Sequence, residues 1–235
     1  KAKEFLSRSG VHFEVVDIMA DPEGMTRLLA FGVRNVPVVA RGKEYVFGQV
    51  LADVARLAGV KPPGQAGLSP AQMVERWLFV LTAAQRFVRQ LPNANLEERA
   101  IANRDRSVRY MAFHVFRIGE AFLEVTQGEE MTVERPNVPP GDELNSGAAI
   151  AVYGDGIIQR ITAWWGSVAD PTCAGKVPTY YGMQPMRDVL ERCTWHSAQH
   201  VRQLMAILER LNIAPDTPVT DKDLAGLPMP KGVWE

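Results

Sequence analysis

The sequence predicts a chain of two parts, a small α/β part followed by an all-α part, and three observations predict it. Up to Gly59 the apolar residues change between a strand-like period of two and a helix-like period of 3.6, which is typical of a small sheet covered by helices. Residues 61–67 (KPPGQAG) contain two prolines and two glycines, which neither continue a helix nor favour a strand interior. From Leu68 onward the apolar positions recur at helical intervals over long segments. We therefore expect domains at residues 1–60 and 68–235.

Composition and charge exclude several classes of function. The 235 residues include 26 basic and 27 acidic side chains, for a formal charge of −1, and no basic run offers a footprint for nucleic acid or an anionic membrane. The longest apolar stretch, near residues 77–84, is too short to span a bilayer, and no signal peptide is recognisable, so a cytoplasmic location is expected. The two cysteines, Cys173 and Cys193, form neither a disulfide framework nor a Cys-x-x-Cys pair.

The elements of the first part follow from local signals, in the order helix, strand, helix, strand, strand, helix. The chain begins with the back half of a helix, which Gly10 closes. Asp21 has the residue type of an N-cap, and Pro22 suits the first turn of a helix that Gly32 ends. The predicted strands are residues 11–18, 33–40 and 44–47, and the last helix follows residues 48–49 and ends near residue 59.

Two loops of this first part resemble loops of glutaredoxins. Residues 35–39 (NVPVV) match the family's Val-Pro loop, whose proline is cis, and Gly48-Gln49 falls where the family has a glycine pair before the last helix. Spacing alone would favour a trans Pro37, since only about 5–6% of X-Pro bonds are cis, and the resemblance reverses that expectation. It also implies that Val36 and Pro37, together with Gly48 and Gln49, bind the backbone and γ-glutamyl end of glutathione.

The resemblance to glutaredoxins is incomplete in two places. Gln49 stands where the family has the second of two glycines, and the family's first strand and Cys-Pro-x-Cys motif are absent, since both would precede Lys1. We therefore expect the natural chain to extend upstream. No thiol–disulfide chemistry is assigned to the residues present, and His12 is interpreted as a surface residue of a strand.

The second part contains four long helical patterns. Ser69 as N-cap and Pro70 begin the first, whose apolar stripe, Trp77 included, is interpreted as core. A polar, proline-rich crossover separates the second pattern from the third; it is too long for a tight hairpin, and it either covers a site or only connects. The tail after Ile213 is expected to wrap the helices or to pack on the other domain. The predicted segments are helices at 69–91, 106–125, 146–167 and 185–211, a short helical turn at 96–102, the crossover at 126–145 and a loop at 169–183.

Three of the four histidines fall on the inward faces of two of these helices. His196 and His200 are four residues apart, so both imidazoles lie on one helix face, and His114 lies in the apolar stripe of the second helix. A buried imidazole needs a partner for at least one ring nitrogen. Either each histidine has its own hydrogen-bond partner, or the three imidazoles share a metal ion, and the paired spacing favours the ion.

The segments around these histidines resemble the DinB-like family of metal-binding helical bundles. The motif RSVR at residues 106–109 before a histidine, and His-x-x-x-His in the last helix, carry the resemblance over about residues 68–211. It implies an antiparallel four-helix bundle with a long crossover between its second and third helices, and a divalent metal, zinc or nickel, held by His114, His196 and His200. Three neutral imidazoles leave coordination positions for water or substrate, as catalytic metal sites do.

Together the two resemblances imply a metal-dependent, glutathione-linked transferase or isomerase that acts on a small electrophile. Its partners would be a small-molecule thiol and the electrophile, and a homodimer is left open. Two alternatives remain: a non-catalytic metal-binding sensor whose front module binds a thiol or a partner, and a metal-assisted hydrolase. No residue is assigned as catalytic. Glu120 and Glu124 are candidates for a general base, although solvated surface carboxylates are the favoured interpretation.

Several other side chains near the histidines have two interpretations each. Cys193 is a fourth metal ligand or, in preference, a small buried hydrophobe. Tyr153 and Trp164 line a pocket or, in preference, pack in the core, because their spacing is helical. Residues 180–181, both tyrosines, could supply phenol groups to the cavity.

Overall fold

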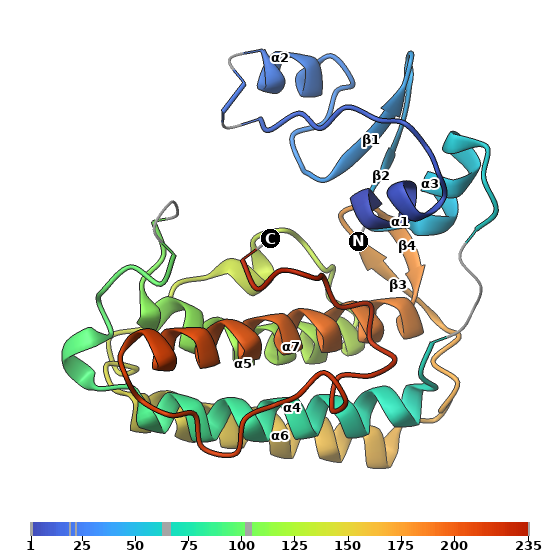
Figure 1. Cartoon of the computed structure of the whole chain (residues 1–235). Coiled ribbons are helices and arrows are strands. Elements are labelled where there is room, and N and C mark those ends of the chain that lie inside the picture. Colours follow the sequence, from blue (N-terminus) through green and yellow to red (C-terminus); the bar gives the residue numbers. More distant parts are fainter. Residues whose placement is uncertain (1, 19, 22, 63–66, 102–104, 235) are drawn as a thin grey trace. The chain divides into compact units, whose positions relative to one another are not determined.

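The computed structural model describes residues 2–18, 20–21, 23–62, 67–101 and 105–234 (Figure 1). It divides into two compact units, Lys1–Ala66 and Gly67–Glu235, each with its own hydrophobic core. Residues 63–66 of the predicted linker lie outside the described residues. None of the described helices combines the length and the apolarity that crossing a membrane requires.

The described residues of the first unit form three short helices and one antiparallel hairpin. Leu6, Val46, Val54 and Leu57 make up its core. Gly10 has a positive φ of 70° just after the first helix, as its predicted role in closing that helix requires. The elements are α1 (Ala2–Arg8), α2 (Gly24–Leu29), β1 (Val38–Arg41), β2 (Glu44–Phe47) and α3 (Leu51–Ala58), with β1 and β2 paired so that Val38 faces Phe47.

The strand predicted at residues 11–18 is wrong. Its alternation of apolar and polar residues predicts a half-buried face, but a strand also needs a neighbouring backbone with which to pair. Here the Val11 N–H donates to the Leu6 carbonyl, and the Asp17 carbonyl accepts from the Asp21 N–H in a turn. Among the described residues, the sheet of this unit is therefore the β1–β2 hairpin alone.

Two boundaries in the first unit also differ from the prediction. The strand expected from residue 33 begins at Val38, beyond the Val36–Pro37 peptide bond, which is cis as the resemblance implied. Asp21 is not the N-cap of α2: the helix begins at Gly24 with Glu23 as its N-cap, and Asp21 Oδ1 accepts the Glu23 N–H at 2.9 Å in the preceding turn. Pro22, predicted in the first turn, lies outside the described residues.

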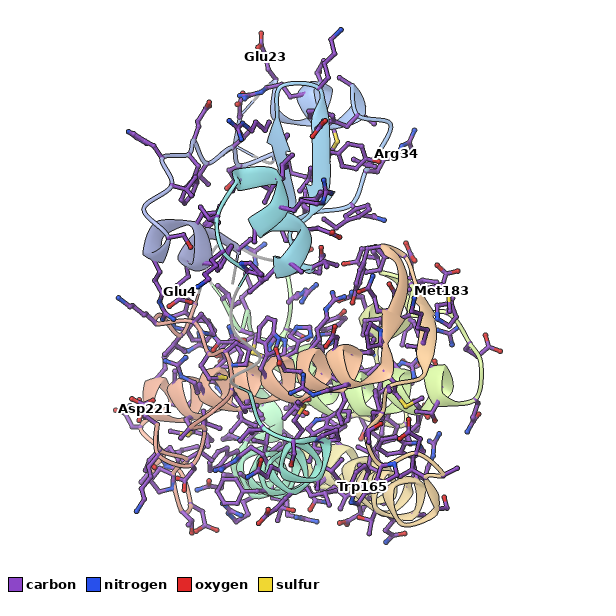
Figure 2. All side chains as sticks on the ribbon, turned by 90° about the vertical axis from the view of Figure 1, so that its right-hand side faces the viewer. Glu4, Glu23, Arg34, Trp165, Met183 and Asp221 are labelled. Carbon is purple, nitrogen blue, oxygen red and sulfur yellow. The ribbon has the colours of Figure 1, made fainter. Side chains whose placement is uncertain are left out.

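Four long helices make up most of the second unit. α4 (Pro70–Gln90) and α5 (Val108–Thr126) each contact both α6 (Gly147–Ser167) and α7 (Met186–Arg210). In Figure 1, α5 and α7 lie in one layer and α4 and α6 in the other. Side chains fill the space between these helices (Figure 2), and Trp77 is fully buried there, as predicted.

Serine N-caps fix the starts of three of these helices. Ser69 and Gln72 form a reciprocal capping box in front of α4, with Pro70 at the first position, which confirms the predicted start. The Ser107 hydroxyl accepts the Tyr110 N–H at the start of α5, and the Ser146 hydroxyl accepts the Ala149 N–H at the start of α6.

The helical turn predicted at residues 96–102 is wrong for residues 96–101; residue 102 lies outside the described residues. The short helix there is η1 (Asn93–Asn95), which ends earlier. The carbonyls that would continue a helix instead accept from the start of α5: Leu96 accepts from the Arg109 N–H at 2.7 Å, and Glu98 from the Val108 N–H at 2.8 Å. These contacts satisfy donors that a helix start leaves without intrahelical partners.

The loop predicted at residues 169–183 contains a hairpin that the sequence did not predict. β3 (Lys176–Thr179) pairs antiparallel with β4 (Gly182–Pro185), and Gly182 has a φ of 98° at the turn. Two prolines in these strands weaken the local strand signal. Met183, labelled in Figure 2, is 55% exposed on β4.

The crossover and the tail both pack on the long helices. The crossover contains η2 (Arg135–Asn137), which contacts α5. The tail follows α4 and α7, since Arg86 on α4 donates to the Thr217 carbonyl at 3.1 Å and Arg202 on α7 donates to the Pro230 carbonyl at 2.8 Å.

Candidate metal centre

Two neighbouring helices bring the three predicted histidines together. His114 lies in the middle of α5, and His196 and His200 lie one turn apart on α7. Each offers one ring nitrogen, and the three nitrogens lie within 4.8 Å of one another. The ring centroids are 4.8–5.3 Å apart. The fourth histidine, His12, belongs to the other unit and is exposed.

The hydrogen bonding of His114 leaves its Nε2 as an available ligand atom. Its Nδ1 lies 2.7 Å from the carbonyl oxygen of Pro136 in η2. Because a carbonyl oxygen only accepts, Nδ1 carries the proton and Nε2 keeps its lone pair. This Nε2 is buried and has no hydrogen-bond partner among the described residues. A buried acceptor of this kind fits a metal ligand whose other nitrogen is held by the protein.

The ring of His200 is oriented in the same way by a side-chain amide. His200 Nδ1 lies 2.7 Å from Gln203 Oε1, and Gln203 Nε2 donates to the Val233 carbonyl at 2.9 Å. The carbonyl of the tail fixes which end of the amide is nitrogen, so the amide oxygen faces the imidazole. His200 therefore carries its proton on Nδ1 and directs Nε2 toward His196, whose Nε2 is 3.1 Å away.

Burial keeps two of the three imidazoles neutral. It lowers the pKa of His114 well below its ordinary value, as do the neighbouring His200 and the positive charge of Arg106, although the bond to Pro136 acts in the opposite direction. Burial likewise lowers the pKa of His196, with His200 and His114 adding to the effect. A neutral imidazole is the form that binds metal.

The spacing of the nitrogens fits one shared ion after a small movement. In a tetrahedral site with metal–nitrogen bonds of about 2.0–2.1 Å, two ligand nitrogens lie about 3.4 Å apart. The 3.1 Å between His196 and His200 is close to that spacing, and a separation of 4.8 Å needs to close by about 1.4 Å. Rotation of the side chains can provide a movement of that size, so the His triad could hold a metal ion.

Cys193 is not part of this cluster of described residues. Burial raises the pKa of its thiol to about 12, against the opposing charge of Arg192, so the sulfur stays protonated at neutral pH. Metal ligands of this type are thiolates. The preferred interpretation, a small buried hydrophobe, fits these observations better than a fourth ligand does.

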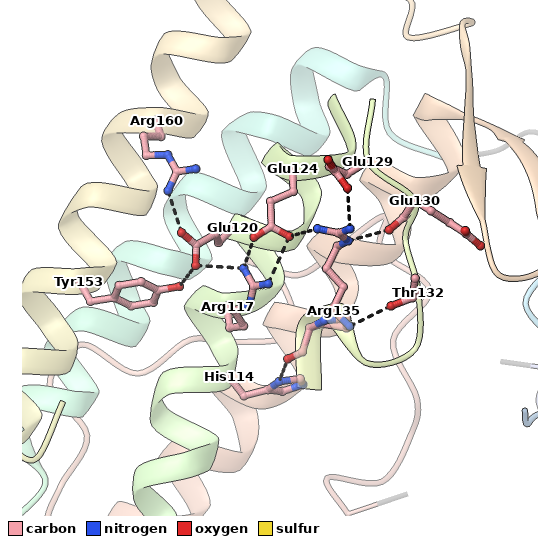
Figure 3. Close-up of polar contacts among 11 residues, drawn as sticks. His114, Arg117, Glu120, Glu124, Glu129, Glu130, Thr132, Arg135, Tyr153 and Arg160 are labelled. Atoms are coloured by element: carbon pink, nitrogen blue, oxygen red, sulfur yellow. Dashed lines mark hydrogen bonds and ion pairs between the residues drawn. The ribbon is translucent and has the colours of Figure 1, made fainter. Parts of the chain in front are cut away.

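A network of charged side chains extends along α5 from the metal centre (Figure 3). Arg117 Nη1 lies 3.0 Å from Glu120 Oε2 and 2.6 Å from Glu124 Oε1. Glu120 also accepts from the Tyr153 hydroxyl at 2.6 Å and from Arg160 at 2.9 Å. The interpretation of Glu120 and Glu124 as solvated surface carboxylates is therefore wrong, because their side chains are only 26% and 24% exposed and are ion-paired.

These ion pairs also make the two carboxylates poor candidates for a general base. Burial raises the pKa of Glu120, but the hydrogen bonds from Tyr153 and Arg160 and the charge of Arg117 lower it below the ordinary value overall. Burial and the bonds from Arg117 and Arg135 have the same two opposing effects at Glu124, whose pKa is also lowered. A general base at neutral pH needs a pKa close to the working pH.

The network ends at the segment that holds His114. Arg135 in η2 lies 2.6 Å from Glu124 and 3.0 Å from Glu129, and its Nε donates to the Glu130 carbonyl at 2.6 Å. The next residue, Pro136, supplies the carbonyl that accepts from His114 (Figure 3). The ion pairs therefore attach the crossover to α5 at the point where it orients His114.

Tyr153 and Trp164 differ in their surroundings. The Tyr153 ring lies 5.1 Å from that of Phe113, and the residue also lines a cavity of about 720 Å³ together with Glu120 and Glu143. Trp164 packs edge-on against Phe122 at 4.9 Å, as a core residue does. Core packing is therefore confirmed for Trp164, whereas Tyr153 both packs and lines the cavity.

Sequence reasoning missed Pro136, Gln203 and Arg192. Pro136 is 22 residues from His114, and no local pattern connects them. The sequence could have indicated Gln203 and Arg192, because each lies three or four residues from a histidine on the face that α7 buries. A polar residue at such a position has to find a partner.

In the first unit, the four residues expected to bind glutathione lie together. The Gly48 N–H donates to the Pro37 carbonyl at 2.8 Å, and Gln49 Nε2 donates to the Val36 carbonyl at 3.4 Å. A Cβ at Gly48 would lie 3.1 Å from Pro37 Cγ, so the close approach of the two loops favours glycine there.

Comparison with known proteins identifies the class of the front module. Residues 1–46 match the glutaredoxin family model, so the chain carries an N-terminal glutaredoxin-like module of the thioredoxin type. The match covers the cis-proline loop, β1 and all of β2 except its last residue, Phe47. No curated protein matches the chain.

Proposed function

We propose that this protein is a metal-dependent, glutathione-linked transferase or isomerase that acts on a small electrophile. The observation that carries the proposal is the meeting of three imidazole nitrogens from α5 and α7 within 4.8 Å. Hydrogen bonds at Nδ1 of His114 and His200 support it, because they leave the Nε2 atoms as ligands.

The metal would be held by His114, His196 and His200 in a DinB-like antiparallel four-helix bundle formed by α4–α7. Imidazole ligands suit zinc and nickel among the divalent ions, and three protein ligands leave room for a further one. A bound divalent ion supplies Lewis acidity, which lowers the pKa of a thiol and yields a thiolate at neutral pH.

Glutathione is proposed as the thiol because the front module matches glutaredoxins. The backbone of the Val36–Pro37 loop and of residues 48–49 is proposed to bind its peptide part. The sulfur would then add to the electrophilic carbon of an activated double bond: the C–S bond forms as the π bond breaks, and the thiol proton passes to the other carbon of that bond. The chain's own contribution is to keep His114 and His196 neutral by burial, and to fix the rings of His114 and His200 through Pro136 and Gln203.

The test is glutathione consumption by the full chain, loaded with zinc or nickel, across a panel of small electrophiles. We expect consumption that disappears when the metal is chelated and in the variant His196→Ala, and that persists in His12→Ala. Absence of both glutathione binding and metal-dependent thiol consumption would remove the proposal.

The same variants separate the two alternatives. A sensor would bind one metal ion per chain, lose it in His196→Ala and consume no thiol with any electrophile. A hydrolase would release product from ester or amide substrates without any dependence on added glutathione.

A further inference from the structure

Arg192 lies beside the candidate metal centre and has no acidic partner among the described residues. It is four residues before His196 on α7, so both side chains lie on one face of the helix. Its Nη2 donates to the Tyr180 hydroxyl at 3.2 Å, and its guanidinium carbon lies 5.5 Å and 5.3 Å from the ring centroids of Tyr180 and Tyr181. The two tyrosines of the β3–β4 hairpin therefore hold the guanidinium in place.

These contacts leave the charge of Arg192 without a counterion. No carboxylate of the described residues lies within ion-pair distance of it, and its Nη1 is buried without a hydrogen-bond acceptor. Stacking on aromatic rings compensates part of the lost hydration. A guanidinium without a carboxylate partner is nevertheless costly to bury, so the binding of an anionic ligand next to Arg192 would be favourable.

A second donor without an acceptor occurs in the same turn of α7. Trp195 is three residues after Arg192, its ring centroid is 5.8 Å from that of His196, and its Nε1 is buried with no partner among the described residues. An indole N–H can only donate. Two buried donors next to the metal centre thus lack acceptors.

A second arginine, Arg106, also lies near the candidate centre. Arg106 lies 5.1 Å from the ring of Tyr110, which stacks on His114, and its Nη2 donates to Asn137 Oδ1 at 3.2 Å. None of the ion pairs within the described ranges involves Arg106 either. The charges of both arginines lower the pKa of His196, which places both in its electrostatic surroundings.

We propose that Arg192 and Trp195 form a carboxylate-binding subsite for the ligand that reacts at the His114–His196–His200 centre. The planar guanidinium matches the two oxygens of a carboxylate, and the indole N–H supplies a further donor. The inference rests on the proposed function and narrows its substrates to ligands that carry a carboxylate. The carboxylate comes either from the electrophile or from glutathione, which carries two.

The test measures binding of succinate, and of succinamide as its neutral isostere, to the metal-loaded full chain by calorimetry. We expect succinate to bind and succinamide not to bind, and Arg192→Gln to weaken succinate about ten- to a hundredfold, with Arg192→Lys in between. Lys176→Gln is the matched control, because it removes one exposed positive charge from the hairpin that carries Tyr180 and Tyr181 and should leave the affinity for succinate unchanged. Metal content should be equal in all four proteins.

A second pair of titrations identifies the source of the carboxylate. If Arg192→Gln weakens glutathione but not its diethyl ester, the thiol provides the carboxylate. If it weakens succinate and leaves glutathione unchanged, the electrophile provides it. Trp195→Phe, which removes only the N–H, should weaken the same ligand and covers the case in which Arg192→Gln fails to fold.

Equal succinate affinity in the wild type, Arg192→Gln and Trp195→Phe, or no succinate binding at all, would overturn the subsite. Failure of the proposed function would give a different result from failure of the subsite. Succinate would still bind in an Arg192-dependent way while no thiol is consumed with any electrophile.

Discussion

At the scale of single residues, the candidate metal centre depends on a backbone carbonyl and a side-chain amide outside the His triad. The Pro136 carbonyl and the Gln203 amide each accept from an Nδ1–H, and so they determine which nitrogen of His114 and His200 is available. Such partners fix ring orientation and raise ligand basicity. The amide of Gln203 is itself held by the Val233 carbonyl, so the tail contributes to the site.

Replacing Gln203 should weaken metal binding without unfolding the helices. We expect Gln203→Leu to lower the metal affinity about 10- to 100-fold, because His200 loses the acceptor of its Nδ1 proton. Competition with a chromophoric chelator measures the affinity, and the thermal midpoint of the metal-free protein checks the fold.

Gln199→Leu is the control for that measurement. Gln199 also donates to the Val233 carbonyl, at 2.6 Å, but it accepts from Arg202 and contacts none of the three histidines by a hydrogen bond. An equal loss of affinity in both variants would mean that only the docking of the tail matters.

The carboxylate of Glu120 should stabilise the protein in a pH-dependent way. Burial raises its pKa, but the bonds from Tyr153 and Arg160 and the charge of Arg117 lower the pKa below its ordinary value overall. A lowered folded-state pKa gives stability that is present above the unfolded-state pKa and lost as the pH falls through the folded-state pKa. Glu120→Gln should therefore cost about 1–3 kcal/mol at pH 7 and progressively less below about pH 4.5.

Urea unfolding of both proteins between pH 3 and pH 7 measures this difference. Glu129→Gln serves as a control, because Glu129 is 63% exposed and its single ion pair should contribute little. A difference between wild type and Glu120→Gln that stays constant with pH would contradict the assignment.

At the scale of elements, glycines set how closely α5 and α6 approach. A Cβ on Gly154 of α6 would lie 2.5 Å from the ring of Phe116 on α5, which is fully buried. A Cβ on Gly156, two residues further along α6, would meet nothing within 4 Å. The sequence places both glycines in the helix, but only one of them is needed for packing.

The two glycines should therefore respond oppositely to alanine. We expect Gly156→Ala to stabilise the protein by up to about 1 kcal/mol through helix propensity, and Gly154→Ala to destabilise it by about 1–3 kcal/mol through overpacking. Chemical denaturation measures both changes. Stabilisation of similar size in both variants would show that Phe116 moves freely out of the way.

Local signals predicted helices well and strand pairing poorly. The serine caps and the 3.6-residue period carry their information within a few residues, so the starts of α4, α5 and α6 follow from the sequence. A strand depends on a distant partner, and the alternating residues 11–18 have none among the described residues. The β3–β4 hairpin was not predicted, because its two prolines weaken the local strand signal.

The candidate site was likewise predictable only where its residues are related by local helical spacing. Helical spacing alone placed His196 beside His200 and turned His114 inward, and the structure brings all three together. Helical spacing could not reveal the Pro136 carbonyl or the Arg135–Glu124 ion pair, because both involve a crossover whose path is set by packing. Residues that orient the ligands were therefore beyond the reach of periodicity.

At the scale of the whole molecule, metal binding should stabilise one unit selectively. All five tryptophans of the chain belong to the second unit, so their fluorescence reports the unfolding of the helices alone. A ligand present at a hundred times its dissociation constant stabilises the folded state by about 2.7 kcal/mol. Zinc should therefore raise the midpoint of the tryptophan-reported transition, and a chelator should reverse the increase.

Two histidine variants control that measurement. His200→Ala should abolish the zinc-induced increase, because it removes a ligand. His12→Ala, in the other unit, should preserve it in full. The opposite pattern would place the zinc site in the first unit.

X-ray absorption spectroscopy of the zinc-loaded full chain tests the central claim most directly. The account predicts three imidazole nitrogens at about 2.0–2.1 Å from the metal, and one imidazole fewer in His114→Ala. A sulfur neighbour at about 2.3 Å, or a spectrum that is unchanged in His114→Ala, would contradict it.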